Sequence, residues 1–258
     1  MSADTPPPRL RKDVATQERR SIETALGPIP DDDLLRAVRD GRGRQFQRLE
    51  FLGDSVLDVV LAVHRWIETS CVLCAGRETL PEASDSHLAQ VAERAGLGSW
   101  LEWRASDERF ADLVETCVAA CWLTGRWPQT ARFVTSVVHP IREPTVRSLT
   151  AGGAGEPGRA ARRVGSAILE LAAASDVYLA MPDADEGALS TARATLHRAS
   201  AIAAEARAAG DILGSRVIRG DDDTVLSQVE DALADTLGAS GADASLVAAQ
   251  QFVSTASG

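Results

Sequence analysis

The sequence predicts an all-α protein, and three observations support this prediction. Apolar residues recur at spacings of three and four in most segments, which is the period of an amphipathic helix. Alternating β-branched residues, the usual sign of strands, are rare, and aromatic residues make up only 4% of the chain. Hydrophobic residues make up 45% of the 258 residues, which is enough for a sizeable core in one or two domains.

The periodicity places the expected helices in two groups. The first group is 17–26, 31–39, 46–68, 84–95, 108–124 and 128–138, and the second is 159–180, 186–208, 223–237 and 242–253. Between them lies AGGAGEPG, 151–158, whose small, helix-breaking residues predict a linker. We therefore expect one domain over 1–150, with its core at about 20–138, and a second over 159–258.

The two groups repeat one another weakly. FLGDSVLDVVLAV at 51–63 matches RVGSAILELAAAS at 163–175, and FADLVETCVAACWLTG at 110–125 matches LSQVEDALADTLGASG at 226–241. The shared order and similar spacing of these segments predict duplication of one helical unit. The alternative is that alanine-rich helices align without common origin.

Two carboxylates in RLEFLGDSVL, 48–57, are unexpected in a segment that is otherwise apolar. Glu50 and Asp54 are four residues apart and share one helix face. Carboxylates at the edge of a buried helix are costly unless they are paired or bind a metal. Gly53 between them would cost about 1 kcal/mol in a helix interior, so it indicates close approach of another backbone or a ligand.

A second pair, Asp112 and Glu115, precedes another apolar run. Two such pairs on buried helices can converge on hard divalent cations, which prefer oxygen ligands. Cleavage of a phosphodiester by two metal ions needs a cluster of this kind. For either pair alone, a solvated face or local ion pairs is the competing interpretation.

RLEFLGDSVL closely resembles the characteristic motif of the ribonuclease III family. The resemblance covers about residues 20–138, including IETALGPIPDDDLLRAV, HLAQVAERAGLGSWL and DLVETCVAACWLTG. It implies that four residues are the catalytic, metal-binding acids: Glu50, Asp54, Asp112 and Glu115. It also implies hydrolysis of double-stranded RNA with Mg²⁺, for which Mn²⁺ can substitute, by domains that work as dimers.

The second half resembles the same family with its acids altered. PDADEGALSTARATLHRASAIA, 182–203, resembles the family's Glu-Gly-x-Leu-Ser-x-x-Arg segment. Opposite Glu50 and Asp54 stand Arg162 and Ser166. Opposite Asp112 and Glu115 the alignment places Gln228 and Asp231. One carboxylate of four cannot hold the metal ions, so we expect this half to be catalytically inactive.

The first half departs from the family pattern as well. ETSCVLCAGRETLPEASDS, 68–86, stands in place of the Glu-Gly-x-Leu-Ser-x-x-Arg segment, and Phe46-Gln47 replaces the usual Asn-Glu. We also expect no double-stranded-RNA-binding domain after the second repeat. In the family, the residue at Phe51 packs into the partner domain. Since the second repeat has Arg163 there, pairing within one chain would make that contact one-sided.

Charge and composition narrow the function further. The net charge is −10, with −3 in residues 1–150 and −7 in 151–258, which argues against a generic nucleic-acid coat protein. The chain has no apolar run of 18 residues and no secretory signal at its start, and it has four cysteines. We therefore expect a cytoplasmic protein that does not associate with membranes.

Other polar and aromatic residues have competing interpretations. Cys71, Cys74, Cys117 and Cys121 could form a zinc site, although buried thiols fit better. The five tryptophans, all within 66–127, could stack on single-stranded RNA or pack in the core. The arginines before the acidic motif could bind phosphate or solvate a surface; they are Arg36, Arg39, Arg42, Arg44 and Arg48.

The sequence thus predicts tandem ribonuclease III-like domains that pack as an intramolecular pseudodimer, with a homodimer also open. Because only the first half has all four acids, we expect a magnesium-dependent endoribonuclease with a single active centre, which nicks one strand of double-stranded or structured RNA. Two alternatives remain: a scaffold that binds RNA or ribosomes without cleaving, and a metal site redirected to a substrate other than RNA.

Overall fold

The computed structural model describes residues 32–70, 84–97, 107–138, 143–152, 159–210, 213 and 218–253, and within these residues it contains helices and no strands. The predicted all-α class is therefore confirmed for the described part of the chain. In chain order the elements are α2 (Asp32–Asp40), α3 (Arg44–Ser70), α4 (Asp85–Arg94), α5 (Asp107–Phe133), the π-helical turn η2 (Val134–Val138), α6 (Glu143–Ala151), α7 (Arg159–Ala180), α8 (Glu186–Leu196), α9 (Ala199–Ala209), α10 (Asp222–Ser240) and α11 (Ala242–Val253). Among them, no helix has the length and apolarity needed to cross a bilayer.

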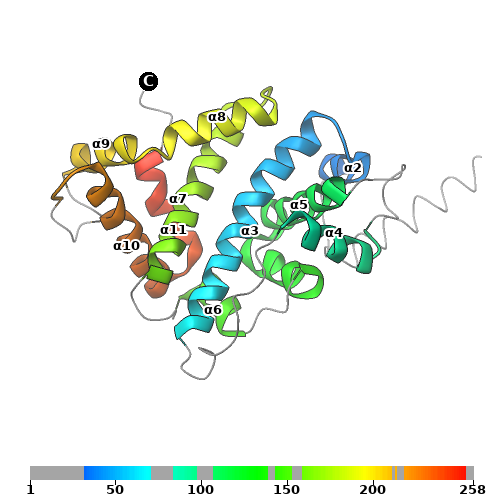
Figure 1. The fold of residues 1–258 in the computed structure, drawn as a ribbon, viewed down its shortest axis with the longest axis horizontal. Coiled ribbons are helices and arrows are strands. Elements are labelled where there is room, and N and C mark those ends of the chain that lie inside the picture. Colours follow the sequence, from blue (N-terminus) through cyan, green and yellow to red (C-terminus); the bar gives the residue numbers. More distant parts are fainter. Residues whose placement is uncertain are drawn as a thin grey trace, which may run out of the picture.

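Helix α3 is the central element, and it lies between α5 on one side and α7 on the other (Figure 1). This position explains why its sequence is apolar nearly all round, since two faces are covered. Its residues with no exposed surface include Leu49, Leu52, Val56, Val59, Val60 and Val63. Helices α2 and α4 pack with α5. Helices α8, α10 and α11 pack with α7, α9 packs with α10 and α11, and α6 lies beneath both groups (Figure 1).

Glycines allow two close helix crossings. A Cβ atom on Gly53 of α3 would lie 1.9 Å from the backbone oxygen of Glu115 in α5. In the second group, a Cβ atom on Gly165 of α7 would lie 2.0 Å from the backbone oxygen of Glu230 in α10. Both helix pairs therefore cross backbone to backbone at a glycine, which accounts for the helix-weakening residue in each apolar run.

Helices α3 and α7 run antiparallel along their contact. Arg48, near the start of α3, donates to the backbone oxygens of Tyr178 and Met181 at the far end of α7. Asp58, further along α3, instead pairs with Arg163 near the start of α7 at 2.9 Å. The two helices thus meet along a contact that is polar at both ends.

Phe51 forms the apolar part of this contact. Its ring is 4% exposed and clusters with Ala174 and Val177 of α7 and Leu189 of α8. Arg163, the residue that the sequence alignment places opposite Phe51, makes an ion pair with Asp58 and does not pack as a second ring.

The helix boundaries agree with the predicted ones in some places and differ in others. Residues 186–208 form α8 and α9 instead of one helix, because Arg198 is extended, with φ −67° and ψ 138°. The break predicted between residues 124 and 128 is confirmed, because Arg126 is non-helical, with φ 51° and ψ −152°, and two helical segments of α5 meet there at a kink. Helix α6 was not predicted, and its last residue, Ala151, was assigned to the linker. The predicted helix 17–26 and linker residues 153–158 lie outside the described residues.

Candidate metal centre

The crossing of α3 and α5 brings three of the four predicted acids together. Glu50, Asp112 and Glu115 each offer one carboxylate oxygen, and these three atoms lie within 4.8 Å of one another. Glu50 and Glu115 are partly buried, and Asp112 is buried at 8% exposure. The close approach at Gly53 sets this arrangement, because it presses the backbone of Glu115 against the turn of α3 that follows Glu50.

The electrostatics of this cluster favour a cation. Burial, followed by the negative charges of Asp54, Glu50 and Asp112, raises the pKa of Glu115 from 4.5 to about 9. Arg109 donates to Asp112 at 3.1 Å, so one positive charge already lies at the edge. Clustered carboxylate oxygens are the ligands that hard divalent cations such as Mg²⁺ prefer, so the residues present fit such an ion.

Asp54, the fourth predicted acid, lies outside this group of three and faces the second half of the chain. Its Oδ2 atom accepts from Nη1 of Arg193 in α8 at 3.5 Å. Although its side chain is 56% exposed, partial loss of solvation raises the pKa of this carboxyl, and the charge of Arg193 opposes the rise. Asp54 remains close enough to Glu115 for its charge to act on that residue, so the four acids form one electrostatic unit.

A polar cleft of about 240 Å³ opens beside the acids, and Asp54 and Glu115 both line it. The remaining polar lining consists of Asp58 and Arg65 from α3 and Arg163 from α7. The cleft therefore offers carboxylates to a cation and two guanidinium groups to an anion, within one cavity formed by both groups of helices.

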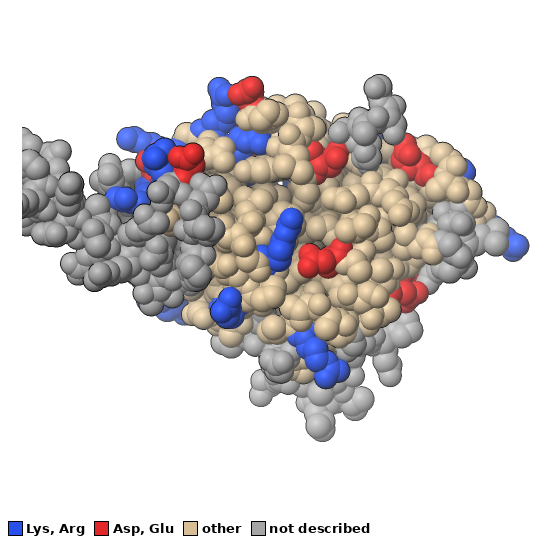
Figure 2. All heavy atoms as spheres, turned by 180° about the vertical axis from the view of Figure 1, so that it is seen from behind, with Lys and Arg blue, Asp and Glu red and all other residues tan. Residues whose placement is uncertain are grey.

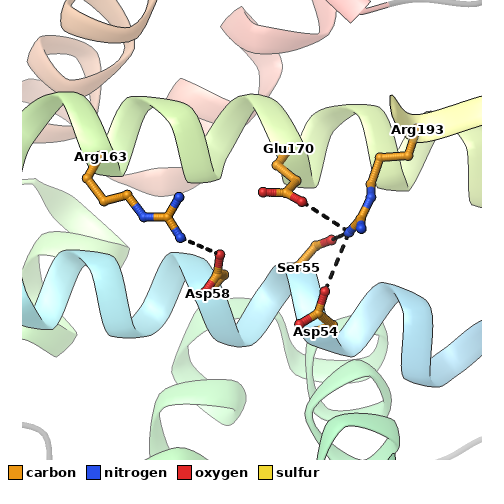
Figure 3. Close-up of polar contacts among 6 residues, drawn as sticks. All are labelled: Asp54, Ser55, Asp58, Arg163, Glu170 and Arg193. Atoms are coloured by element: carbon orange, nitrogen blue, oxygen red, sulfur yellow. Dashed lines mark hydrogen bonds and ion pairs between the residues drawn. The ribbon is translucent and has the colours of Figure 1, made fainter. Parts of the chain in front are cut away.

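Ion pairs connect α3 with the second half directly above this cleft. Figure 3 shows Arg163 reaching from α7 to Asp58, while Arg193 points toward Asp54, Ser55 and Glu170. Of these residues, sequence reasoning named Asp54 as functional and Arg193 only as part of a resembling segment. The retention of that segment was the signal that could have indicated its role.

The second half has a different arrangement at its corresponding crossing. Arg162 makes two hydrogen bonds to Asp231, at 3.2 and 3.3 Å. The residue pressed against Gly165 is Glu230, so Glu230 takes the place that the sequence alignment gave to Asp231. The alignment was wrong by one residue there, because its spacing was anchored on Gly125 and Gly241. Gly241 ends α10 with φ 86° and ψ 176°, and the first-half residue with a similar backbone conformation is Arg126, with φ 51° and ψ −152°, one residue after Gly125.

Several other candidates have structural roles. Arg48 is 4% exposed and held by backbone oxygens of α7, which excludes both a solvated surface and free access to phosphate. The tryptophans at 66, 122 and 127 are buried, as are Cys117 and Cys121. Arg36 pairs with Asp33 at an exposed position. Cys71, Cys74 and the other two tryptophans lie outside the described residues.

Comparison with known proteins gives one partial similarity. No family model matches the chain. A protein named ribonuclease 3 from Pseudothermotoga lettingae is 33% identical over 92 residues, which is 31% of this chain. The chain spans 38% of the length of that relative. Part of the chain is therefore similar to a ribonuclease 3.

Proposed function

We propose that this chain is a metal-dependent endoribonuclease that cleaves double-stranded or structured RNA. The observation that carries the proposal is the convergence of Glu50, Asp112 and Glu115 within 4.8 Å, with Asp54 beside them on the polar cleft. The partial similarity to a ribonuclease 3 supports the same reaction class. These four acids would hold Mg²⁺ or Mn²⁺.

The chemistry follows from where the chain fixes its carboxylates. Bound Mg²⁺ would lower the pKa of a water molecule and stabilise charge on the phosphodiester. The protein supplies the fixed geometry: Glu50 and Glu115 are oriented by the backbone contact at Gly53, and Asp112 is held by Arg109. The cleft leaves room beside them for part of an RNA backbone, whose phosphates Arg65 and Arg163 can approach.

We further propose that the chain is a tandem of ribonuclease III-like domains, 1–150 and 159–258, paired as an intramolecular pseudodimer. The glycine crossings at Gly53 and Gly165, the antiparallel contact of α3 with α7, and the burial of Phe51 in the second half support this arrangement. At the second crossing Arg162 replaces an acid, so one centre would act and one strand would be nicked.

Affinity for RNA would come from the cleft rather than from a broad basic surface. On the face shown in Figure 2, some blue arginine side chains lie singly among uncharged residues, and others gather toward one side next to red acidic ones, so the described residues form no continuous basic surface there. With a net charge of −10, long-range attraction of RNA is weak. Specific contacts near the acids, together with the metal ions, would then dominate recognition.

The test is cleavage of end-labelled duplex RNA by the full chain with Mg²⁺. We expect wild-type protein to nick one strand, and Asp54→Asn and Glu115→Gln to abolish cleavage. Asp231→Asn, an acid of the second half, is the matched control and should retain cleavage. Inertness of the wild type on varied duplexes would refute the nuclease, and cuts in both strands opposite each other would indicate two chains paired through their first halves.

The same experiment has to distinguish the nuclease from a scaffold that binds RNA without cleaving it. If the wild type binds duplex RNA tightly without cutting it, and Asp54→Asn binds equally well, the acids have no role in chemistry and the scaffold interpretation replaces the nuclease.

A further inference from the structure

Arg193 of α8 reaches from the second half of the chain to the candidate centre of the first. Its Nη1 atom lies 3.0 Å from Oγ of Ser55, 3.2 Å from Oε1 of Glu170 and 3.5 Å from Oδ2 of Asp54 (Figure 3). The guanidinium also stacks over the ring of Phe51, with 5.1 Å to the ring centroid. The side chain is only 20% exposed.

The contacts with Glu170 and Phe51 fix the position of the guanidinium, and the orientation of Asp54 then depends on the guanidinium. Glu170 of α7 and the ring of Phe51 fix the position of Arg193, because each is partly or fully buried. Asp54, by contrast, has a side chain that is 56% exposed and lines the cleft. The contact with Asp54, at 3.5 Å, is the longest of the three, and a guanidinium fixed in this place biases the orientation of the exposed carboxylate mainly through its charge.

The sequence shows a matching asymmetry between the two halves. The run Glu186-Gly187-x-Leu189-Ser190-x-x-Arg193 occurs in the second half, and the first half has no such run. The first half has the four acids, and the second half has Arg162 and Ser166 at two of the corresponding positions. The first half therefore has the acids of the candidate centre and no such run, whereas the second half has the run that contains Arg193 and not all of the acids.

We infer that Arg193 is a positioning residue for the first-half centre, and that the second half supplies it. The inference rests on the proposed metal-binding role of the acids. Arg193 sets the orientation of Asp54 and also contributes a positive charge to the site. Its loss should therefore have two separable effects: a cation binds more tightly because a repelling charge is gone, and cleavage slows because Asp54 is no longer held.

Calorimetric titration of the full chain with Mn²⁺ tests the charge effect without relying on activity. We expect Arg193→Met to lower the dissociation constant for Mn²⁺ by about threefold or more, since one positive charge leaves the neighbourhood of the ion. Arg207→Met is the matched control, because Arg207 also pairs with an acid, Asp222, but on the surface of α9 and α10. An unchanged or higher dissociation constant in Arg193→Met would overturn the inference.

The positioning effect is tested with Arg193→Lys, which keeps the charge and is the milder change if the methionine variant does not fold. All three polar contacts converge on one guanidinium nitrogen, but a lysine has no planar group to stack over the Phe51 ring, so its ammonium would be held less firmly beside Asp54. We expect a dissociation constant within about twofold of wild type and a single-turnover cleavage rate about tenfold lower. A wild-type rate in this variant would overturn the inference, while inertness of a metal-binding wild type would overturn only the nuclease.

Discussion

Replacing Gly53 with alanine should separate α3 from α5 and destabilise the protein. The new Cβ atom would lie 1.9 Å from the backbone oxygen of Glu115 and 2.5 Å from its carbonyl carbon. The helices would have to move apart by about 1.1 Å for the shorter distance to reach 3.0 Å. Because a helix backbone cannot rotate away as a side chain can, we expect a cost of about 3 kcal/mol, at the upper end for overpacking. The better helix propensity of alanine offsets about 1 kcal/mol of this cost, so the free energy of unfolding should fall by about 2 kcal/mol.

Urea unfolding followed by far-ultraviolet circular dichroism measures this loss. The control is Gly238→Ala within α10, where the nearest atom to a new Cβ is in Trp66 at an ordinary 3.6 Å. That variant gains helix propensity without a clash, so its free energy of unfolding should rise by up to about 1 kcal/mol. Equal stability of Gly53→Ala and Gly238→Ala would show that the backbone contact does not constrain the fold.

Three further predictions concern packing and ionisation. Phe51→Ala should lower the free energy of unfolding by about 3 kcal/mol, because the ring is buried between the halves; a loss under about 1 kcal/mol in urea unfolding would contradict that burial. Arg48→Met leaves the backbone oxygens of Tyr178 and Met181 without their donor, so a loss of about 2 kcal/mol is expected, measured by thermal unfolding. In metal-free protein, stability should fall as the pH rises from about 5 toward 9, because folded Glu115, with a pKa of about 9, keeps a proton that the unfolded chain releases near 4.5. Glu115→Gln should flatten this slope, and an unchanged slope in denaturant titrations at several pH values would refute the assignment.

Much of the helical fold could be predicted because its signals are local. The apolar periodicity located α7 and α11 at their observed bounds, 159–180 and 242–253, and located α3 within two residues at each end. The division between α8 and α9 could not be predicted in this way. No glycine or proline marks it, and Arg198 is extended because α9 turns to pack against α10 and α11, which is a tertiary effect.

The candidate site was predictable only where its residues are neighbours along one helix. Glu50 and Asp54 share a face of α3, and Asp112 and Glu115 share a face of α5, so each pair follows from helical spacing. The way in which the helices cross decides that Glu50, Asp112 and Glu115 converge and that Asp54 faces Arg193 instead. The pairing of Asp54 with Arg193, 139 residues away, has no local signal at all.

The contact between α3 and α7 also distinguishes one pairing partner from another. Asp58 forms an ion pair with Arg163, and Phe51 packs against Ala174, Val177 and Leu189. If two copies of α3 met in the same antiparallel arrangement, Phe51 of one copy would take the position of Arg163, and Asp58 of the other copy would lose its ion pair. An unpaired charge at an interface disfavours the wrong partner. The unequal chemistry at the two ends of this contact therefore fits α7 better than it would fit a second copy of α3.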